Sequence, residues 1–184
     1  YQDRLYRNIG NGKFQYDSTA LPKIESSGSC VVANDFDHDG DLDLFVGGRI
    51  VPQRYPESPE SYLLINDGRG KFESSTDKYS HELSEVGMVS AALWSDINND
   101  GWSDLAVVGE WMPITFFINE GGKSFTSLKV PETTGWWNSI SGGDFDNDED
   151  IDYVVGNLGL NSIYKASVNE PVCIYAKDFD DNGS

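Results

Sequence analysis

Four short acidic segments of nearly the same sequence recur along the chain. They share the pattern Asp-x-Asp/Asn-x-Asp/Asn-Gly-x-x-Asp, with one exception at the glycine in the third and no ninth residue in the fourth. They begin at Asp35, Asp96, Asp144 and Asp178. Side-chain oxygens at positions 1, 3, 5 and 9, together with a backbone carbonyl at position 7, suit a hard cation of the size of calcium. The repeated pattern therefore predicts a series of calcium-binding loops, and the fold must supply the same loop several times.

The residues that follow each acidic segment distinguish these loops from EF-hands. An EF-hand loop ends with a bidentate Glu at position 12 and continues into a helix. Position 12 is instead Val46, Val107 and Val155 in the three complete segments. Each of these valines lies in a short apolar or β-branched run that ends in glycine, which is typical of a strand. The segments are therefore predicted to be strand–loop–strand calcium sites.

A second repeated pattern lies between the acidic segments. An apolar run leads into a glycine-rich turn that begins at Asn8, Asn66 or Asn119 and is followed by Lys and Phe. Glycines supply the positive φ angles of tight hairpin turns, so each copy predicts a β-hairpin. With the acidic segments, these hairpins define a unit of four strands. In the first complete unit, we expect an inner strand at 30–34, a second strand at 42–46 and a hairpin at 62–73.

Repetition of a four-stranded unit predicts an all-β fold in which the units are β-propeller blades packed around an axis. The acidic segments begin 61, 48 and 34 residues apart. The first interval is lengthened by a Pro-rich stretch, 49–60, which we expect to be an exposed loop. The last interval is too short for a full hairpin. Either that unit is compressed, or residues 157–165 replace its outer strands.

The acidic segment followed by the Asn-x-Gly-x-Gly hairpin resembles the FG-GAP, or VCBS, repeat of integrin-α-like propellers. Phrases such as Asn157-Leu-Gly-Leu-Asn161 are also similar to bacterial relatives of cartilage acidic protein, which often carry an ASPIC/UnbV segment. The resemblance implies a propeller of about seven blades, of which this chain would hold about three four-stranded blades plus pieces of neighbouring blades. Residues 1–184 would then be a fragment of one domain, with blade pieces at roughly 1–20, 28–80, 87–130, 137–168 and 170–184.

The resemblance further implies one calcium ion per complete loop, bound for rigidity. In the first loop the implied ligands are Asp35, Asp37, Asp39, Asp41 (by its carbonyl) and Asp43. In the second they are Asp96, Asn98, Asp100, Trp102 (by its carbonyl) and Asp104. In the third they are Asp144, Asp146, Asp148, Asp150 (by its carbonyl) and Asp152. The fourth offers Asp178, Asp180, Asn182 and the Ser184 carbonyl, without a ninth residue.

The third loop departs from the pattern at position 6, where Glu149 replaces the usual glycine. Because glycine normally makes the sharp turn at that position, we expect strain in the backbone of this loop. Five aspartates remain in the segment, so it is still expected to attract a cation.

The charge of the chain limits its partners. The formal net charge is −18, and the four acidic segments hold 16 of the aspartates. Nucleic acid is excluded as a partner because binding phosphates requires basic stripes, which the sequence lacks. No apolar run of 18 residues is present, so the chain is not expected to span a membrane. Sites with a Kd of roughly 10⁻⁵ to 10⁻⁴ M would be mostly empty at cytosolic calcium, which favours an extracellular, cell-surface or periplasmic location.

No recognisable catalytic constellation accompanies the acidic segments. In-register repetition of aspartates is what structural metal ligands require, whereas a unique active site does not. The two histidines, His38 and His81, have no recognisable Ser or Cys partner. We therefore expect a non-enzymatic module that binds an unidentified protein or glycan. The alternative is part of a propeller enzyme, such as a polysaccharide lyase, or a chain with a catalytic domain elsewhere.

Tryptophans are the better candidates for a binding surface. Trp111 ends the second strand of one unit, and Trp136 and Trp137 lead into the inner strand of the next. Connections of this kind lie on the faces of a propeller, where Trp suits sugars or partner side chains. Packing between blades is the other reading of the same residues. An open arc of blades also exposes apolar faces, so we expect the chain to self-associate.

The two cysteines occupy equivalent positions, five residues before an acidic segment. Cys30, Ala91, Ser139 and Cys173 correspond in the four copies, which indicates a crowded place that needs a small side chain. Equivalent positions in non-adjacent units rarely satisfy the Cα spacing of a disulfide. We therefore predict that Cys30 and Cys173 are not bonded to each other.

Overall fold

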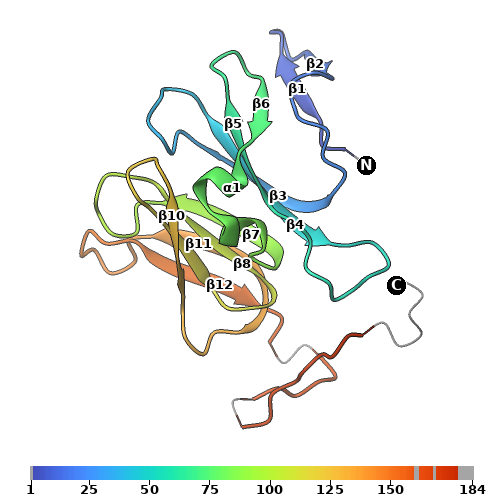
Figure 1. Cartoon of the computed structure of the whole chain (residues 1–184). Coiled ribbons are helices and arrows are strands. Elements are labelled where there is room, and N and C mark those ends of the chain that lie inside the picture. The colour runs from blue at the N-terminus through green and yellow to red at the C-terminus, as the bar shows by residue number, and fades with distance from the viewer. Residues whose placement is uncertain (1, 160–161, 168, 178–184) are drawn as a thin grey trace.

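A computed structural model describes residues 2–159, 162–167 and 169–177 of the chain (Figure 1). Its strands are arranged in three antiparallel groups that follow the order of the sequence. They are β1 (Leu5–Asn8), β2 (Phe14–Asp17), β3 (Ser27–Asn34), β4 (Asp43–Ile50), β5 (Tyr62–Asn66), β6 (Phe72–Ser74), β7 (Met88–Ser95), β8 (Asp104–Met112), β9 (Thr115–Asn119), β10 (Phe125–Lys129), β11 (Gly135–Gly143) and β12 (Asp152–Asn157). Two one-turn helices, α1 (Thr76–Tyr79) and α2 (His81–Ser84), follow β6.

The first complete unit is a four-stranded meander in the order β3–β4–β5–β6. Strands β7–β8–β9–β10 repeat this arrangement, and β11 and β12 repeat its first two strands. The second and third units are joined because the start of β11 pairs with the end of β8, through Gly135 with Met112 and Trp136 with Glu110. Inner strands β3, β7 and β11 are neighbours in space. The chain is therefore all-β, with the layered, repeating sheets of a partial propeller.

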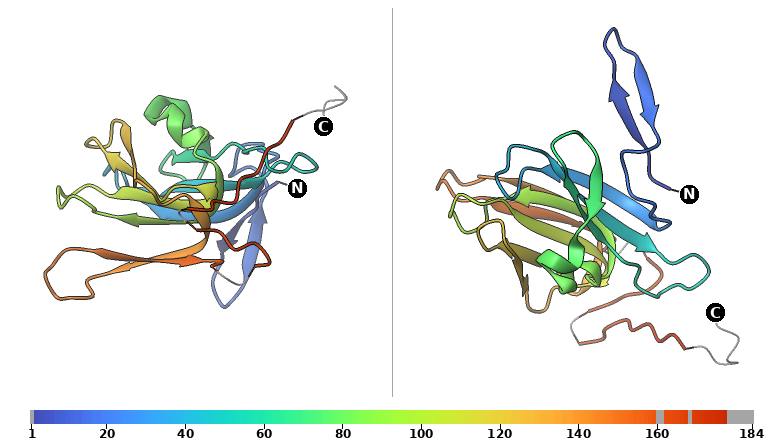
Figure 2. Two further views of the ribbon diagram at one scale, coloured as in Figure 1. Left: turned by 90° about the horizontal axis from the view of Figure 1, so that it is seen from below. Right: turned by 45° about the horizontal axis from the view of Figure 1, so that its top comes forward.

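The N-terminal hairpin and the helical insertion lie outside this repeat. Strands β1 and β2 pair only with each other, and the hairpin projects from the stacked sheets (Figure 2). The two short helices pack beside β5 and contribute Tyr79 and Leu83 to the core. None of the described helices is both long and apolar enough to cross a bilayer. Sequence patterns did not predict α1 or α2, since each is only one turn long and has no apolar periodicity.

The main core fills the space between the first and second units. Successive residues of a strand face opposite sides of its sheet. Phe45 of β4 accordingly points into the main core, whereas Val46 faces a smaller cluster on the other side with Leu64. Phe36, from the first acidic loop, is fully buried between the sheets and stacks on Trp94 at 5.9 Å between ring centroids. Aromatic and β-branched residues therefore hold neighbouring units together.

Serine side chains connect each inner strand to the next. A β-bulge interrupts the pairing of β3 at Ser29, and another interrupts that of β7 at Ser90. The Ser29 hydroxyl donates to the carbonyl of Val89 at 2.7 Å, and the Ser90 hydroxyl donates to that of Trp137 at 2.6 Å. The same contact thus recurs at both junctions between units.

Cys30 and Ser139 lie at close approaches of the kind that the sequence indicated, whereas Cys173 is exposed and lies in no strand. Cys30 pairs with Gly47, and a Cβ added to that glycine would lie 2.9 Å from the Cys30 sulfur. Ser139 likewise faces Gly156, where an added Cβ would lie 2.5 Å from the hydroxyl. In both pairs, a glycine on the neighbouring strand leaves room for the side chain of Cys30 or Ser139. Both cysteines are free thiols, in agreement with the prediction that they form no disulfide.

Two connections differ in detail from the simple repeat. The Pro-rich stretch was predicted to be a loop over 49–60, but its first two residues extend β4, which ends at Ile50. Residues 51–60 form the loop to β5 and are mostly exposed, although Pro59 is buried and Tyr55 is hydrogen-bonded to the neighbouring unit. After β12, the described residues from Leu158 to Lys177 form no strand. Within those residues, the third unit therefore has no outer hairpin like that of the first two.

Candidate metal centres

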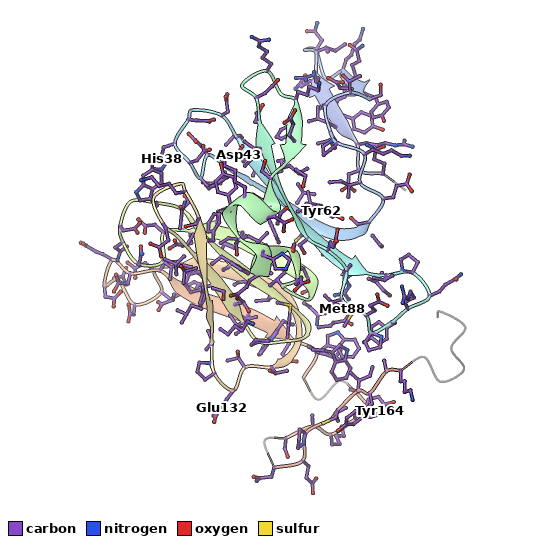
Figure 3. The ribbon with its side chains drawn as sticks, in the orientation of Figure 1. His38, Asp43, Tyr62, Met88, Glu132 and Tyr164 are labelled. Carbon is purple, nitrogen blue, oxygen red and sulfur yellow. The ribbon has the colours of Figure 1, made fainter. Side chains whose placement is uncertain are left out.

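The three complete acidic segments all lie at one end of the sheets. They connect β3 to β4, β7 to β8 and β11 to β12, which confirms that they are strand–loop–strand elements. Figure 1 shows these loops together on the left, and Figure 3 places His38 of the first loop at that end. Residues 178–184, with the predicted ligands Asp178, Asp180 and Asn182, lie outside the described residues.

One pattern of hydrogen bonds shapes all three loops. The amide at position 6 donates to the carboxylate at position 1, and the amide at position 7 donates to the carboxylate at position 5. The first bond joins Gly40 to Asp35, Gly101 to Asp96 and Glu149 to Asp144, at 2.8 to 3.1 Å. The second joins Asp41 to Asp39, Trp102 to Asp100 and Asp150 to Asp148, at 2.8 to 3.0 Å. The backbone of each loop therefore orients the carboxylates at positions 1 and 5 without the help of a cation.

A hairpin asparagine binds each of the first two acidic loops to its sheet. The backbone N–H of Asn66 donates to the Asp43 carboxylate at 2.8 Å, and the Asn66 side-chain amide donates to the Leu42 carbonyl at 3.1 Å. In the second unit, Asn119 repeats both bonds, to Asp104 at 2.7 Å and to the Ser103 carbonyl at 3.0 Å. The two sequence patterns occur together because the turn of one supports the last aspartate of the other.

The first loop fits a cation well. One carboxylate oxygen from each of Asp35, Asp37 and Asp39 lies within 4.8 Å of the others. Two oxygens that bind the same calcium ion lie at most about 5 Å apart, given ligand distances of about 2.3 to 2.6 Å. Asp35 Oδ1 and Asp43 Oδ2 are buried and have no hydrogen-bond partner. Buried carboxylate oxygens are costly without a partner, and a bound cation would supply one.

The second and third loops differ in how closely their acidic side chains gather. In the third loop, Asp144, Asp146 and Asp152 gather as closely as the aspartates of the first, although all three are exposed. The second loop shows no group of three acidic side chains this close among the described residues, and its position 3 is Asn98 rather than an aspartate. Both Asp104 oxygens accept backbone amides, from Ile97 and Asn119. Asp43 and Asp148 lie outside the groups in their own loops. The structure thus brings together some of the predicted ligands in two loops out of three.

A family model agrees with this architecture. The model for the FG-GAP-like repeat matches residues 1–46 and 96–155. The chain belongs to the FG-GAP-like repeat family. No curated protein matches the chain. The two stretches that match include all three complete acidic segments of the FG-GAP-like chain and the hairpins at Asn8 and Asn119, whereas the hairpin at Asn66 lies between the two stretches.

The acidic loops of this FG-GAP-like chain contact one another. The rings of His38 and Trp102 stack at 4.1 Å between centroids, which joins the first loop to the second. The Asn99 side chain donates to Asp150 at 2.6 Å, which joins the second loop to the third. The Asn119 side-chain amide, in the β9–β10 hairpin, donates to the Phe36 carbonyl of the first loop at 2.8 Å. The loops therefore form one continuous edge.

Burial changes the acidity of the last aspartate in the first loop. Asp43 is fully buried, and this desolvation raises its pKa to about 7. The negative charges of Asp37, Asp39 and Asp35 contribute in the same direction, and the amide of Asn66 opposes them. Without a cation, the folded state therefore keeps a proton on Asp43 that the unfolded state releases near pH 4. The contribution of Asp43 to the stability of the calcium-free protein therefore falls as pH rises from about 4 to about 7.

We expect Asp43→Asn to have opposite effects with and without calcium. The amide keeps the acceptor for Asn66 but removes the buried charge, so the calcium-free variant should be more stable than the parent at pH 7.5 by about 1 to 2 kcal/mol. Calcium affinity should fall because a ligand oxygen is lost. Urea unfolding of calcium-stripped protein at pH 5 and pH 7.5 measures the first effect. An equal pH dependence in parent and variant would contradict it.

We expect Glu149→Gly to stabilise the protein. Glu149 has a φ of 74°, in the left-handed region where Gly40 and Gly101 take the equivalent positions. Glycine relieves this backbone strain, for an expected gain of about 0.5 to 1 kcal/mol. Thermal melting in saturating calcium is the measurement. Gly101→Ala is the matched control, because an added Cβ there meets nothing within 4 Å and only backbone strain is introduced. Equal melting temperatures for all three proteins would refute the prediction.

A cluster at the opposite end of the sheets joins residues from three segments. We call Arg49, Tyr55, Glu110, Trp111 and Trp136 the Trp111 cluster. The Trp111 indole donates to the Tyr55 hydroxyl at 2.6 Å, and that hydroxyl donates to Glu110 at 3.2 Å. Arg49 forms an ion pair with the buried Glu110. The rings of Trp111 and Trp136 lie 5.4 Å apart between centroids.

Only the tryptophans of this cluster could be singled out from the sequence. Arg49 and Tyr55 belong to the Pro-rich stretch, and nothing in its composition connects them to Glu110. Burial raises the pKa of Tyr55, which keeps its hydroxyl protonated and able to donate. The structure therefore adds a polar network to what the sequence showed as isolated aromatic residues.

Proposed function

We propose that this chain is a calcium-stabilised, non-enzymatic propeller module that binds a protein or glycan outside the cytoplasm. The observation that carries the proposal is the first loop, in which buried oxygens of Asp35 and Asp43 lack any partner. The ligands would be the carboxylates and carbonyls named from the sequence, one set for each complete loop. FG-GAP repeat proteins are commonly extracellular, where calcium is plentiful.

Electrostatics explains why such loops would need a metal. Two like charges about 4 Å apart repel by about 4 kcal/mol at an effective dielectric of about 20. Each loop draws several carboxylates together, so it opposes its own folding until a cation binds. At millimolar calcium and a Kd of roughly 10⁻⁵ to 10⁻⁴ M, binding stabilises the fold by about 1.4 to 2.7 kcal/mol per site.

Calorimetric titration of the calcium-stripped chain tests the metal half of the proposal. We expect binding of about one calcium ion per complete loop, with the strongest site lost in Asp35→Ala. Magnesium should bind more weakly, because it demands near-ideal octahedral geometry and gives up water reluctantly. Absence of calcium binding at millimolar concentration would reject the metal half.

The non-enzymatic half is tested separately. Incubation with a panel of uronic-acid polysaccharides, followed by ultraviolet absorbance of unsaturated products, detects lyase activity. We expect no increase with this chain. A calcium-dependent increase that scales with protein concentration would instead support a propeller enzyme.

Self-association is the third part of the proposal. The β11–β12 unit exposes apolar residues, with Phe145 60%, Val154 59% and Ile151 39% accessible. Phe145 occupies the position of Phe36, which is fully buried where a neighbouring unit covers it. An uncovered unit of this kind favours contact with another copy. We expect light scattering to give a mass above 20.4 kDa, and a monodisperse monomer would contradict this part.

A further inference from the structure

The Trp111 cluster lies at the end of the sheets that is remote from the acidic loops. Met88, the register partner of Glu110, marks this end in Figure 3, and His38 marks the other. Tyr55 is 42% exposed, and both tryptophans are half-buried. A ligand can therefore reach the cluster without entering the core.

Trp111 has an unusual backbone conformation. Its φ of 59° lies in the left-handed region, which bulky side chains rarely adopt. The hydrogen bond from its indole to Tyr55 holds the ring in place. Strained residues that surrounding contacts keep in one position are concentrated at binding sites. The strained backbone therefore marks the ring of Trp111 and its contacts as a candidate binding site.

Two hydrogen-bond donors of the cluster are unused. Arg49 Nη1 is shielded from solvent and has no partner, although the Nη2 of the same guanidinium pairs with Glu110. The indole N–H of Trp136 donates to no acceptor within the described residues. Glu110 accepts from both Arg49 and Tyr55. Because Arg49 Nη1 is shielded, the Trp136 indole N–H is the donor that a ligand can reach. A ligand for this cluster must accordingly offer an oxygen acceptor beside a surface that packs on indole rings.

Charge decides among the ligands with that chemistry. The net charge of −18 opposes the approach of an anionic ligand. A cationic ligand would lie beside Arg49 and would find no free carboxylate oxygen in the cluster, because both Glu110 oxygens already accept hydrogen bonds. A neutral sugar ring avoids both penalties, because each hydroxyl accepts and donates while the apolar face of the ring packs on an aromatic side chain. Binding sites commonly combine aromatic walls with a few polar groups in this way.

We propose that the Trp111 cluster binds a neutral sugar ring of a glycan, with Trp111 and Trp136 as the packing surface and the Trp136 indole N–H as a donor to a ring hydroxyl. The proposal rests on the binding function proposed above and assigns it a place and a ligand class. Tyr55 acts as a positioning residue, since its hydroxyl fixes the Trp111 indole.

The test uses the whole chain in calcium. A glycan array of neutral oligosaccharides of glucose, galactose, mannose and N-acetylglucosamine, with hexuronic acid oligosaccharides beside them, identifies binders. Calorimetry with the best neutral oligosaccharide then compares variants. We expect Trp136→Ala to weaken affinity at least tenfold, or about 1.4 kcal/mol, and Tyr55→Phe to weaken it about threefold. Phe14→Ala removes an aromatic side chain that is 65% exposed on β2, and it should leave affinity unchanged.

The possible results distinguish failure of this sugar site from failure of the proposed calcium-stabilised binding module. Binding of neutral glycans with equal affinity for the parent and Trp136→Ala would overturn the site but keep a glycan-binding module. Failure of every neutral oligosaccharide to bind would overturn the inference, while calcium-dependent melting would still support the propeller module. If Trp136→Ala fails to fold, Trp136→Phe and Tyr55→Phe serve instead. A packing role alone predicts that these two lower the melting temperature without changing affinity.

Discussion

Removal of calcium should lower the melting temperature of this chain by about 10 to 30 °C. Three sites that each contribute about 1.4 to 2.7 kcal/mol sum to about 4 to 8 kcal/mol, if the loops bind independently. For a chain of this length, 1 kcal/mol corresponds to about 2 to 4 °C. Differential scanning calorimetry of calcium-loaded and calcium-stripped protein measures the difference. The expected loss approaches the whole stability of a typical domain, so partial unfolding without calcium is also expected.

Two controls make this result specific. Restoring calcium should return the melting temperature to its starting value, whereas the same concentration of magnesium should restore only part of it. A variant in which Asp35 and Asp37 are both Ala should respond less to calcium than the parent does. Identical melting curves with and without calcium would show that the acidic loops fold without a metal, and the proposed role would then be wrong.

Much of the fold could be predicted because the same short-range patterns occur several times. Val at position 12 separated these loops from EF-hands, and the structure confirms that β4, β8 and β12 follow them. Glycine-rich turns after Asn66 and Asn119 became the β5–β6 and β9–β10 hairpins. These features are set by neighbours within a few residues of each other, and local sequence is sufficient to indicate such features.

Contacts between units were not predictable in the same way. The Ser29 hydroxyl meets Val89 across 60 residues of sequence, and His38 stacks on Trp102. Neither serine nor histidine carries a signal for such a partner, because the contact depends on how two sheets pack. The Trp111 cluster shows the same limit, since Tyr55 approaches Glu110 only after the Pro-rich loop folds back over the next unit. Tertiary packing therefore decides which residues of the repeat contact one another.

Asn119→Ala is expected to destabilise the calcium-loaded protein by about 3 to 5 kcal/mol. The Asn119 side chain is 1% exposed and makes three hydrogen bonds. It donates to the carbonyls of Phe36 and Ser103 and accepts from the amide of Gly122, at 2.7 to 3.0 Å. Alanine would leave all three groups unpaired, and the bond to Phe36 is buried whereas the other two are partly buried. Each unpaired buried group costs about 1 to 3 kcal/mol. Urea unfolding in saturating calcium measures the change.

Asn66→Ala is the matched control, because Asn66 occupies the same position one unit earlier. Its side chain makes the equivalent bonds to Leu42 and to the turn glycines, but none to another unit, and water can reach these groups. We expect a loss of only about 1 to 2 kcal/mol there. The backbone amides that support Asp43 and Asp104 are retained in both variants, so the difference isolates the bond to Phe36 and its burial. Equal losses in the two variants would show that this bond between units adds nothing to stability.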